Sequence, residues 1–231
     1  SSTTIEIVLI MKYYSIAFVA LLISIAGCTS AQHKSIQYLA LGDSYTIGEA
    51  VNEEERWPMQ LANRLETADL DIQTTFIATS GWRTDDLIRG IESASAKSDY
   101  DMVSLLIGAN NQFQKRDFLQ YDKEFDQLLA KAIELARGDT AAVFVVSIPD
   151  YYYTPFGQAR GTALISEELN AYNSYAEAKC LEWGVSFVNI TPISEQGILN
   201  PELVAKDGLH PSGQQYSLWV DQILKEVELA K

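Results

Sequence analysis

Cysteine and histidine are scarce in this sequence, which has two of each among its 231 residues. The cysteines are Cys28, near the start, and Cys180. If Cys28 carries a lipid, as argued below, Cys180 has no partner for an intrachain disulfide, and stability must come from a packed core. The histidines are His33 and His210. Because His33 lies close to the expected anchor, chemistry that needs an imidazole in a folded domain depends on His210.

Basic residues are also few, with 17 Lys and Arg against 31 Asp and Glu and a formal net charge of −14 at pH 7. Nucleic-acid binding needs clustered Lys and Arg to neutralise phosphates, so this composition argues against a nucleic-acid partner. The sequence has no G-x-S-x-G, and therefore lacks the nucleophile turn of α/β-hydrolases. It has no P-loop and no G-x-G-x-x-G, so nothing supports nucleotide binding. No metal or cofactor is predicted, because no histidine accompanies the acidic run at 53–55.

The first long apolar run lies near the start of the chain. Residues 11–30 read MKYYSIAFVALLISIAGCTS, with one basic residue, Lys12, ahead of an apolar stretch over 13–27. Spanning a bilayer takes about 20 residues, so this stretch is too short and is typical of a secretory signal. It ends in Ile-Ala-Gly before Cys28, which resembles a bacterial lipobox, where the cysteine becomes the acylated first residue. An ordinary signal with a chance cysteine is the alternative.

We therefore expect residues 1–27 to be a pre-sequence and lipoprotein signal peptide, residues 28–35 a tether and residues 36–231 a single domain. Cys28 is the expected lipidation site. The expected location is the cell envelope, with the protein anchored to a membrane through Cys28 and facing the periplasm or the exterior. The sequence leaves open which membrane carries the anchor, and it leaves the oligomeric state open.

After residue 35, short apolar runs alternate with longer amphipathic stretches. The short runs are rich in Val, Ile, Leu and Phe, as in strands buried on both faces: 36–41, 72–78, 102–107, 141–148 and 185–190. Helical patterns follow them: 57–66, 85–95, 118–137, 166–183 and 214–229. Five alternations of strand and helix predict an α/β fold, with helices packed around a parallel sheet.

Small and polar residues follow the first three expected strands and precede the last expected helix. The segments are Gly42-Asp43-Ser44-Tyr45, Thr79-Ser80-Gly81-Trp82, Gly108-Ala109-Asn110-Asn111 and Asp207-Gly208-Leu209-His210-Pro211. In open parallel sheets, ligands bind outside the carboxyl ends of the strands. We therefore expect these segments, far apart in sequence, to form one site.

These four segments, in this order, resemble the four sequence blocks of the GDSL/SGNH hydrolases, and the resemblance covers roughly residues 36–229. It implies a three-layer α/β/α sandwich with a five-stranded parallel, flavodoxin-like sheet. It also implies a triad, with Ser44 as nucleophile, His210 as general base and Asp207 as the carboxylate that orients His210. The implied oxyanion hole consists of the backbone N–H groups of Ser44 and Gly81 and the side-chain amide of Asn110.

Elementary chemistry agrees with this assignment. A serine hydroxyl is a poor nucleophile until a base removes its proton, and histidine titrates in the range that this task requires. Asp207 lies three residues before His210, and Gly208 between them allows a tight turn. Asp150, at the end of the fourth expected strand, is a rival carboxylate, but nothing in the sequence ties it to His210.

Other site residues have structural alternatives. Ser44 could cap a helix, Gly81 could serve only a turn, and Asn110 could shape the turn after the third strand. The third block of the family often ends in Asp, where this chain has Asn111; in the family this position supports the site rather than reacting. Cys180 is expected to be an inert thiol in the core.

Aromatic residues come from loops at the same expected edge of the sheet. They are Tyr151, Tyr152, Tyr153 and Phe156 after the fourth strand, with Trp82 and Phe113 in neighbouring loops. A cleft lined by such rings could hold an acyl chain or stack on a sugar.

The expected function is a serine esterase that hydrolyses carboxylic esters through an acyl-serine intermediate, acting on lysophospholipids or on short-chain acyl esters. A carbohydrate O-acetylesterase is the alternative within this chemistry. A non-catalytic envelope lipoprotein that binds glycan or lipid is the alternative outside it.

Overall fold

The computed structural model describes residues 34–227. Within them, five strands form one sheet: β1 (Lys34–Gly42), β2 (Leu70–Ala78), β3 (Met102–Leu106), β4 (Val143–Val146) and β5 (Ser186–Val188). The strands are all parallel and lie in the order β2-β1-β3-β4-β5. This is the flavodoxin-like order, so the structure confirms the predicted five-stranded parallel sheet.

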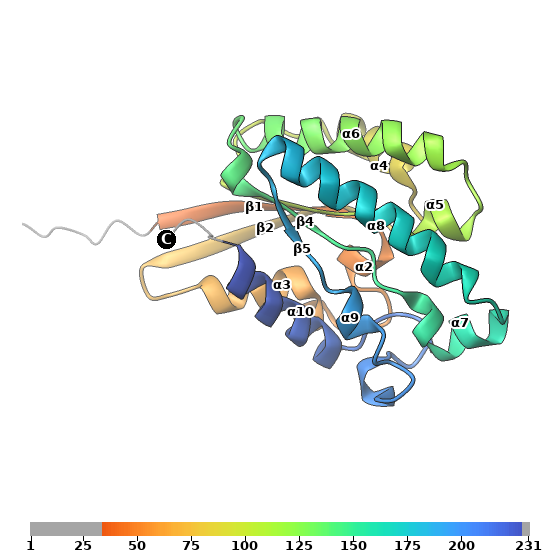
Figure 1. The fold of residues 1–231 in the computed structure, drawn as a ribbon. Helices are drawn as coiled ribbons and strands as arrows, with labels where there is room; N and C mark the ends of the chain where they lie inside the picture. The colour runs from red at the N-terminus through yellow and green to blue at the C-terminus, as the bar shows by residue number, and fades with distance from the viewer. Residues whose placement is uncertain (1–33, 228–231) are drawn as a thin grey trace, which may run out of the picture. The chain divides into compact units, whose positions relative to one another are not determined.

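Helices cover both faces of the sheet (Figure 1). One face carries α3 (Trp57–Leu65) and α10 (Gly213–Glu226), and the other carries α4 (Thr84–Ala94), α6 (Phe118–Leu135) and α8 (Leu164–Trp183). Each long helix turns one apolar side to the sheet; in α6 that side includes Tyr121, Phe125, Leu128 and Ala132. The predicted three-layer α/β/α sandwich is therefore confirmed. No helix within residues 34–227 is long and apolar enough to cross a membrane.

Short helices fill the loops and were not predicted. They are α2 (Ser44–Ile47), α5 (Ala109–Phe113), α7 (Pro155–Arg160) and α9 (Thr191–Ser194), with 3-10 turns η1 (Glu53–Glu55), η2 (Thr140–Ala142), η3 (Tyr151–Tyr153) and η4 (Pro201–Leu203). The longest of them, α7, has six residues. Fewer than two turns are too short for a repeating apolar pattern to emerge in the sequence.

The sheet begins earlier than the sequence pattern indicates. Lys34 and Ser35, assigned above to the tether, belong to β1 and pair with Leu70 and Asp71 of β2. Both residues are exposed, so no apolar pattern marks them, although their backbone continues the ladder. Residues 1–33, with the expected signal peptide, Cys28 and most of the tether, lie outside the described residues.

Gly42, the last residue of β1, permits the close packing that positions the next segment. A Cβ atom at Gly42 would lie 2.1 Å from Oγ1 of Thr46 and 2.5 Å from the carbonyl oxygen of Leu106. Since that carbonyl belongs to β3, it cannot move away without disturbing the sheet. Glycine therefore allows α2 to pack tightly against the ends of β1 and β3, and Ser44 begins α2.

Candidate active site

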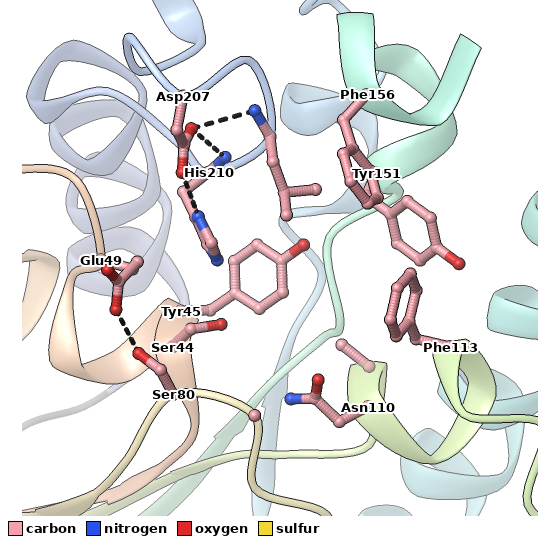
Figure 2. A pocket seen from close by; sticks show the side chains of 13 residues that line it. Ser44, Tyr45, Glu49, Ser80, Asn110, Phe113, Tyr151, Phe156, Asp207 and His210 are labelled. Carbon is pink, nitrogen blue, oxygen red and sulfur yellow. Dashed lines mark hydrogen bonds and ion pairs between the residues drawn. The ribbon is translucent and has the colours of Figure 1, made fainter. Parts of the chain in front are cut away.

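A cavity of about 350 Å³ lies at the edge of the sheet where β1, β2 and β3 end. All five residues predicted for the triad and the oxyanion hole line this cavity: Ser44, Gly81, Asn110, Asp207 and His210. Figure 2 shows the side chains of Ser44, Asn110, Asp207 and His210 converging from separate loops. The strand order reverses between β1 and β3, which is the place where open α/β sheets bind ligands.

Ser44 is the first residue of α2, and its side chain lines the cavity. The helix cap is Asp43, whose Oδ1 accepts a hydrogen bond from the backbone N–H of Tyr45 at 3.0 Å. The alternative role of Ser44 as the helix cap is therefore wrong. Because the Asp43 side chain caps α2, the Ser44 hydroxyl does not have this role.

Asp43 also reaches the loop after β3. Its Oδ2 lies 3.4 Å from Nδ2 of Asn110. Burial raises the pKa of the Asp43 carboxyl group to about 7, although hydrogen bonds from Tyr45 and Asn110 oppose the shift. This buried carboxyl group lies behind the cavity lining and joins the segments that follow β1 and β3.

Asp207 and His210 lie on a tight turn between η4 and α10. Gly208 adopts φ +74°, a left-handed conformation that favours glycine. Oδ1 of Asp207 accepts hydrogen bonds from the backbone N–H groups of Leu209 and His210, each at 3.0 Å, and Oδ2 lies 2.5 Å from Nδ1 of His210. The turn therefore fixes the imidazole through Nδ1 and leaves Nε2 to act on other groups.

The carboxylate of Asp207 is suited to remain charged. Partial burial alone would raise its pKa, but hydrogen bonds from the His210 ring and from two backbone N–H groups outweigh burial and lower the pKa below its usual value. A charged Asp207 stabilises an imidazolium at His210. Asp150, the rival carboxylate, instead caps η3 by accepting a hydrogen bond from Tyr152 N–H.

The ring of His210 packs against Tyr45, with 5.3 Å between ring centroids. His210 and Ser44 line the same cavity (Figure 2). Among the described residues, no hydrogen bond joins the Ser44 hydroxyl to the His210 ring. In unliganded serine hydrolases this contact is often long and tightens only when substrate binds, so the arrangement remains compatible with general-base chemistry.

Gly81 and Asn110 come from the loops after β2 and β3. Gly81 adopts φ +83°, and its carbonyl oxygen accepts a hydrogen bond from Gln114 Nε2 at 3.3 Å. Nδ2 of Asn110 donates to the carbonyl oxygen of Trp82 at 3.0 Å. An amide nitrogen carries two hydrogens, and here Trp82 accepts one and Asp43 the other, at 3.4 Å. To donate to a group in the cavity, Asn110 would have to give up the longer of these bonds, the one to Asp43.

Asn111, the departure from the family pattern, does not line the cavity as Asn110 does and is fully buried. Its Oδ1 accepts a hydrogen bond from the backbone N–H of Thr84 at 3.0 Å, and its Nδ2 donates to Oγ1 of Thr84 at 2.6 Å. It thereby satisfies a backbone donor at the start of α4 and fixes the loop after β2 to α5. A charged aspartate could accept hydrogen bonds here but could not donate one to Oγ1 of Thr84 as Asn111 does.

Aromatic rings form the apolar side of the cavity. Phe113 contacts Tyr151 and Phe156, with ring centroids 6.1 and 6.0 Å apart, and the guanidinium of Arg160 lies 4.5 Å from the centre of the Phe113 ring. Three of the six aromatic residues predicted for the cleft therefore line it. Trp82 packs against Gly90 of α4 instead, and Tyr152 and Tyr153 form an edge-on pair outside the lining.

Four further lining residues lie in the segments predicted to form the site but were given no role: Tyr45, Ser80, Ala109 and Leu209. Sequence reasoning missed Glu49, which lines the cavity but lies outside those segments and has no signal in the sequence. Cys180 is buried, and burial raises the pKa of its thiol to about 12, in keeping with the inert thiol predicted. Within residues 34–227, no cluster of His, Cys, Asp and Glu could hold a metal ion.

A serine, a histidine and a carboxylate at the carboxyl edge of a parallel sheet define the general class of serine hydrolases. The model of the GDSL-like lipase/acylhydrolase family matches residues 40–218, a span that contains all five predicted site residues. The chain belongs to this family and is a hydrolase of ester bonds. The resemblance noted in the sequence is thereby confirmed.

Solved structures share the fold at low sequence identity. A lipolytic protein of the G-D-S-L family from Veillonella parvula is 20% identical, with a TM-score of 0.63, covering 82% of this chain and 97% of that chain. An acetylxylan esterase from Geobacillus stearothermophilus is 17% identical (TM-score 0.65; 86% and 97% covered). A lipase from a goat rumen metagenome is also 17% identical (TM-score 0.68; 85% and 99% covered). Comparison with curated proteins gives no match.

The raised pKa of Asp43 predicts a pH-dependent difference in stability between the wild type and Asp43→Asn. An aspartate has a usual pKa of 3.8, whereas the folded carboxyl group titrates at about 7. Between these values the folded state holds a proton that the unfolded state has lost, so wild-type stability falls as pH rises. Asparagine does not titrate.

The melting temperature of Asp43→Asn minus that of the wild type should therefore rise from about pH 4 to about pH 7 and then level off. Thermal melts followed by circular dichroism measure this difference. A difference that stays constant over this range would contradict the raised pKa.

Proposed function

We propose that the protein is a serine esterase that hydrolyses short-chain carboxylic esters through an acyl-serine intermediate. Ser44 is the nucleophile, His210 the general base and Asp207 the carboxylate that orients His210. The observation that carries this proposal is the single cavity in which these residues meet Gly81 and Asn110. A binding protein without catalytic activity has no need of this combination.

In the proposed reaction, the Ser44 hydroxyl attacks the ester carbonyl carbon while Nε2 of His210 takes its proton. Asp207 stabilises the imidazolium. The backbone N–H groups of Ser44 and Gly81 and the amide of Asn110 stabilise the negative charge on the former carbonyl oxygen. The bond to the alcohol breaks, and His210 gives the proton to the departing oxygen. Water then attacks the acyl-serine in the same way and releases the carboxylic acid.

The size of the cavity supports a short acyl group. Its volume is about 350 Å³, near the lower end of the roughly 300–1,000 Å³ found for ligand pockets. The apolar side formed by Phe113, Tyr151 and Phe156 suits a chain of a few carbons. These features favour a short-chain acyl esterase over a lysophospholipase-like enzyme.

A carbohydrate O-acetylesterase is the second candidate. Acetate is the shortest of these acyl groups, and the other side of the cavity carries Glu49 and Ser80, whose oxygens can bond sugar hydroxyls. The non-catalytic alternative, an envelope lipoprotein that binds glycan or lipid, is disfavoured because Ser44 and His210 are both present and line one cavity.

Replacing Ser44 or His210 by alanine should lower kcat for p-nitrophenyl acetate by about 10⁴-fold or more, because nucleophile and base act as one unit. For the same reason, the double variant should be little worse than either single variant. Circular dichroism and melting temperature verify that each variant is folded. Substantial hydrolysis by purified, folded Ser44→Ala would rule out Ser44 as the nucleophile.

The neighbours Asn110 and Asn111 should give opposite results when each is replaced by alanine. Asn110→Ala should lower kcat by about 10²–10³-fold with little change in KM, because an oxyanion donor acts mainly on charge in the transition state. Asn111→Ala leaves the N–H of Thr84 unpaired, which costs about 1–3 kcal/mol of stability.

Steady-state kinetics and melting temperatures of both variants separate the two roles. Asn111→Ala should keep most of its turnover and melt several degrees lower, at about 2–4 °C per kcal/mol. If Asn110→Ala instead keeps more than about a tenth of the wild-type kcat and melts lower, Asn110 only shapes its turn.

The preference for acyl length should depend on Phe156. With p-nitrophenyl esters from acetate to octanoate, the wild type should favour the short end. Phe156→Ala removes a ring from the apolar side and should raise the ratio of octanoate to acetate hydrolysis by about tenfold, a change typical of hydrophobic pockets. Tyr153→Ala, an aromatic position of the same segment outside the lining, is the matched control. Equal ratios in both variants would contradict this acyl-binding side.

We also propose that the mature protein is anchored in the cell envelope through a lipid on Cys28, on the basis of the lipobox-like segment that ends there. Cys28→Ser should release the protein from membranes into a soluble fraction, because acyl chains contribute about 0.8 kcal/mol per buried CH₂. Mass spectrometry of the native protein should find an acylated Cys28 at the mature N-terminus. An unmodified N-terminus elsewhere refutes the anchor and leaves the esterase assignment intact.

A further inference from the structure

The two sides of the cavity differ in chemistry. The rings of Phe113, Tyr151 and Phe156 lie on one side of Ser44, whereas Glu49 and Ser80 lie on the other (Figure 2). An ester has an acyl part and an alcohol part, and in the proposed reaction the rings take the acyl part. The alcohol part then extends toward the polar side.

The position of His210 leads to the same orientation. The base must return its proton to the departing alcohol oxygen, so the alcohol has to lie within reach of the imidazole. In Figure 2, Glu49 is on the side of His210 away from the aromatic rings. The alcohol part of a bound ester would therefore lie beside the Glu49 carboxylate.

The carboxylate of Glu49 is held in place. The backbone N–H of Glu49 donates to the carbonyl oxygen of Ser44 at 3.0 Å, and Oε2 of Glu49 accepts a hydrogen bond from the hydroxyl of Ser80. The bond from Ser80 joins the segment after β1 to the loop after β2. A hydroxyl donor leaves the negative charge of the carboxylate uncancelled.

No Lys or Arg is among the residues that line the cavity, and the other lining carboxylate, Asp207, is occupied by His210. The basic side chains nearest in sequence to these loops have other partners. Arg56 lies 3.5 Å from Glu53, and Arg83 forms ion pairs with Asp85 and Asp86. Arg160 lies against the Phe113 and Phe156 rings, on the acyl side, so Glu49 is the charged lining residue on the alcohol side.

We propose that Glu49 is a specificity-determining residue that makes the enzyme select esters of neutral or cationic alcohols and discriminate against esters whose alcohol part is anionic, such as phosphorylated or sulfonated alcohols. This inference rests on the proposed esterase activity and names its substrate class. Two unit charges a few ångströms apart at a hydrated site change a rate or binding constant by a few-fold, and salt reduces the effect.

A competing role for Glu49 is mechanical. Ser80 precedes Gly81, so the bond to Glu49 could serve only to hold the N–H of Gly81 in position. The two roles make different predictions, because Glu49→Gln removes the charge but keeps an acceptor, whereas Ser80→Ala removes the bond but keeps the charge.

The experiment measures kcat/KM for three acetate esters of similar size and different charge: acetylcholine, its neutral isostere dimethylbutyl acetate, and sulfopropyl acetate. Wild type, Glu49→Gln, Ser80→Ala and Glu54→Gln are compared at low and high salt. Glu54 is exposed and outside the cavity lining, so its variant has the same change in net charge as Glu49→Gln and serves as the matched control.

We expect Glu49→Gln to raise kcat/KM for sulfopropyl acetate and to lower it for acetylcholine, each by about three- to tenfold at low salt, with the neutral ester changing least. Salt near 1 M should abolish most of this difference. Ser80→Ala and Glu54→Gln should retain the wild-type ratios of kcat/KM among the three esters.

Equal losses for all three esters in both Glu49→Gln and Ser80→Ala would assign Glu49 the mechanical role and overturn the proposal. Unchanged ratios of kcat/KM among the three esters in Glu49→Gln would overturn it as well, while wild-type hydrolysis of the neutral ester would still uphold the esterase. Absence of hydrolysis of every ester by the wild type would refute the esterase itself.

Discussion

The site depends on one buried carboxyl group. Oδ1 of Asp43 caps α2 and so sets the direction of Ser44, while Oδ2 lies 3.4 Å from the amide of Asn110. Asn110 in turn donates to the carbonyl oxygen of Trp82 at 3.0 Å. The loops after three strands are thereby joined through two polar side chains. Burial raises the pKa of Asp43 to about 7, because it disfavours the charged form of the carboxyl group. Proteins accept local costs of this kind at functional sites.

The sheet could be predicted from sequence because its strands are buried on both faces. Such strands are continuous apolar runs, and β3 and β4 are buried at every position. The residues of the cavity could be predicted for a related reason, since parallel strands end at one edge and each predicted segment follows a strand or precedes α10. The place of Lys34 and Ser35 in β1 could not be predicted, because these exposed residues are held in the strand by backbone pairing alone and show no apolar pattern.

Two other features of the site could be recognised only from the structure. Asn110 and Asn111 are adjacent in α5, where successive side chains point in different directions. Asn110 lines the cavity, whereas Asn111 is hydrogen-bonded to Thr84. The sequence alone does not show which of the two asparagines has which role. Glu49 lies a few residues before three other glutamates in the chain, and in the sequence it resembles an ordinary solvent-exposed acidic residue. Only the contact with Ser80, from a loop more than thirty residues away, distinguishes it.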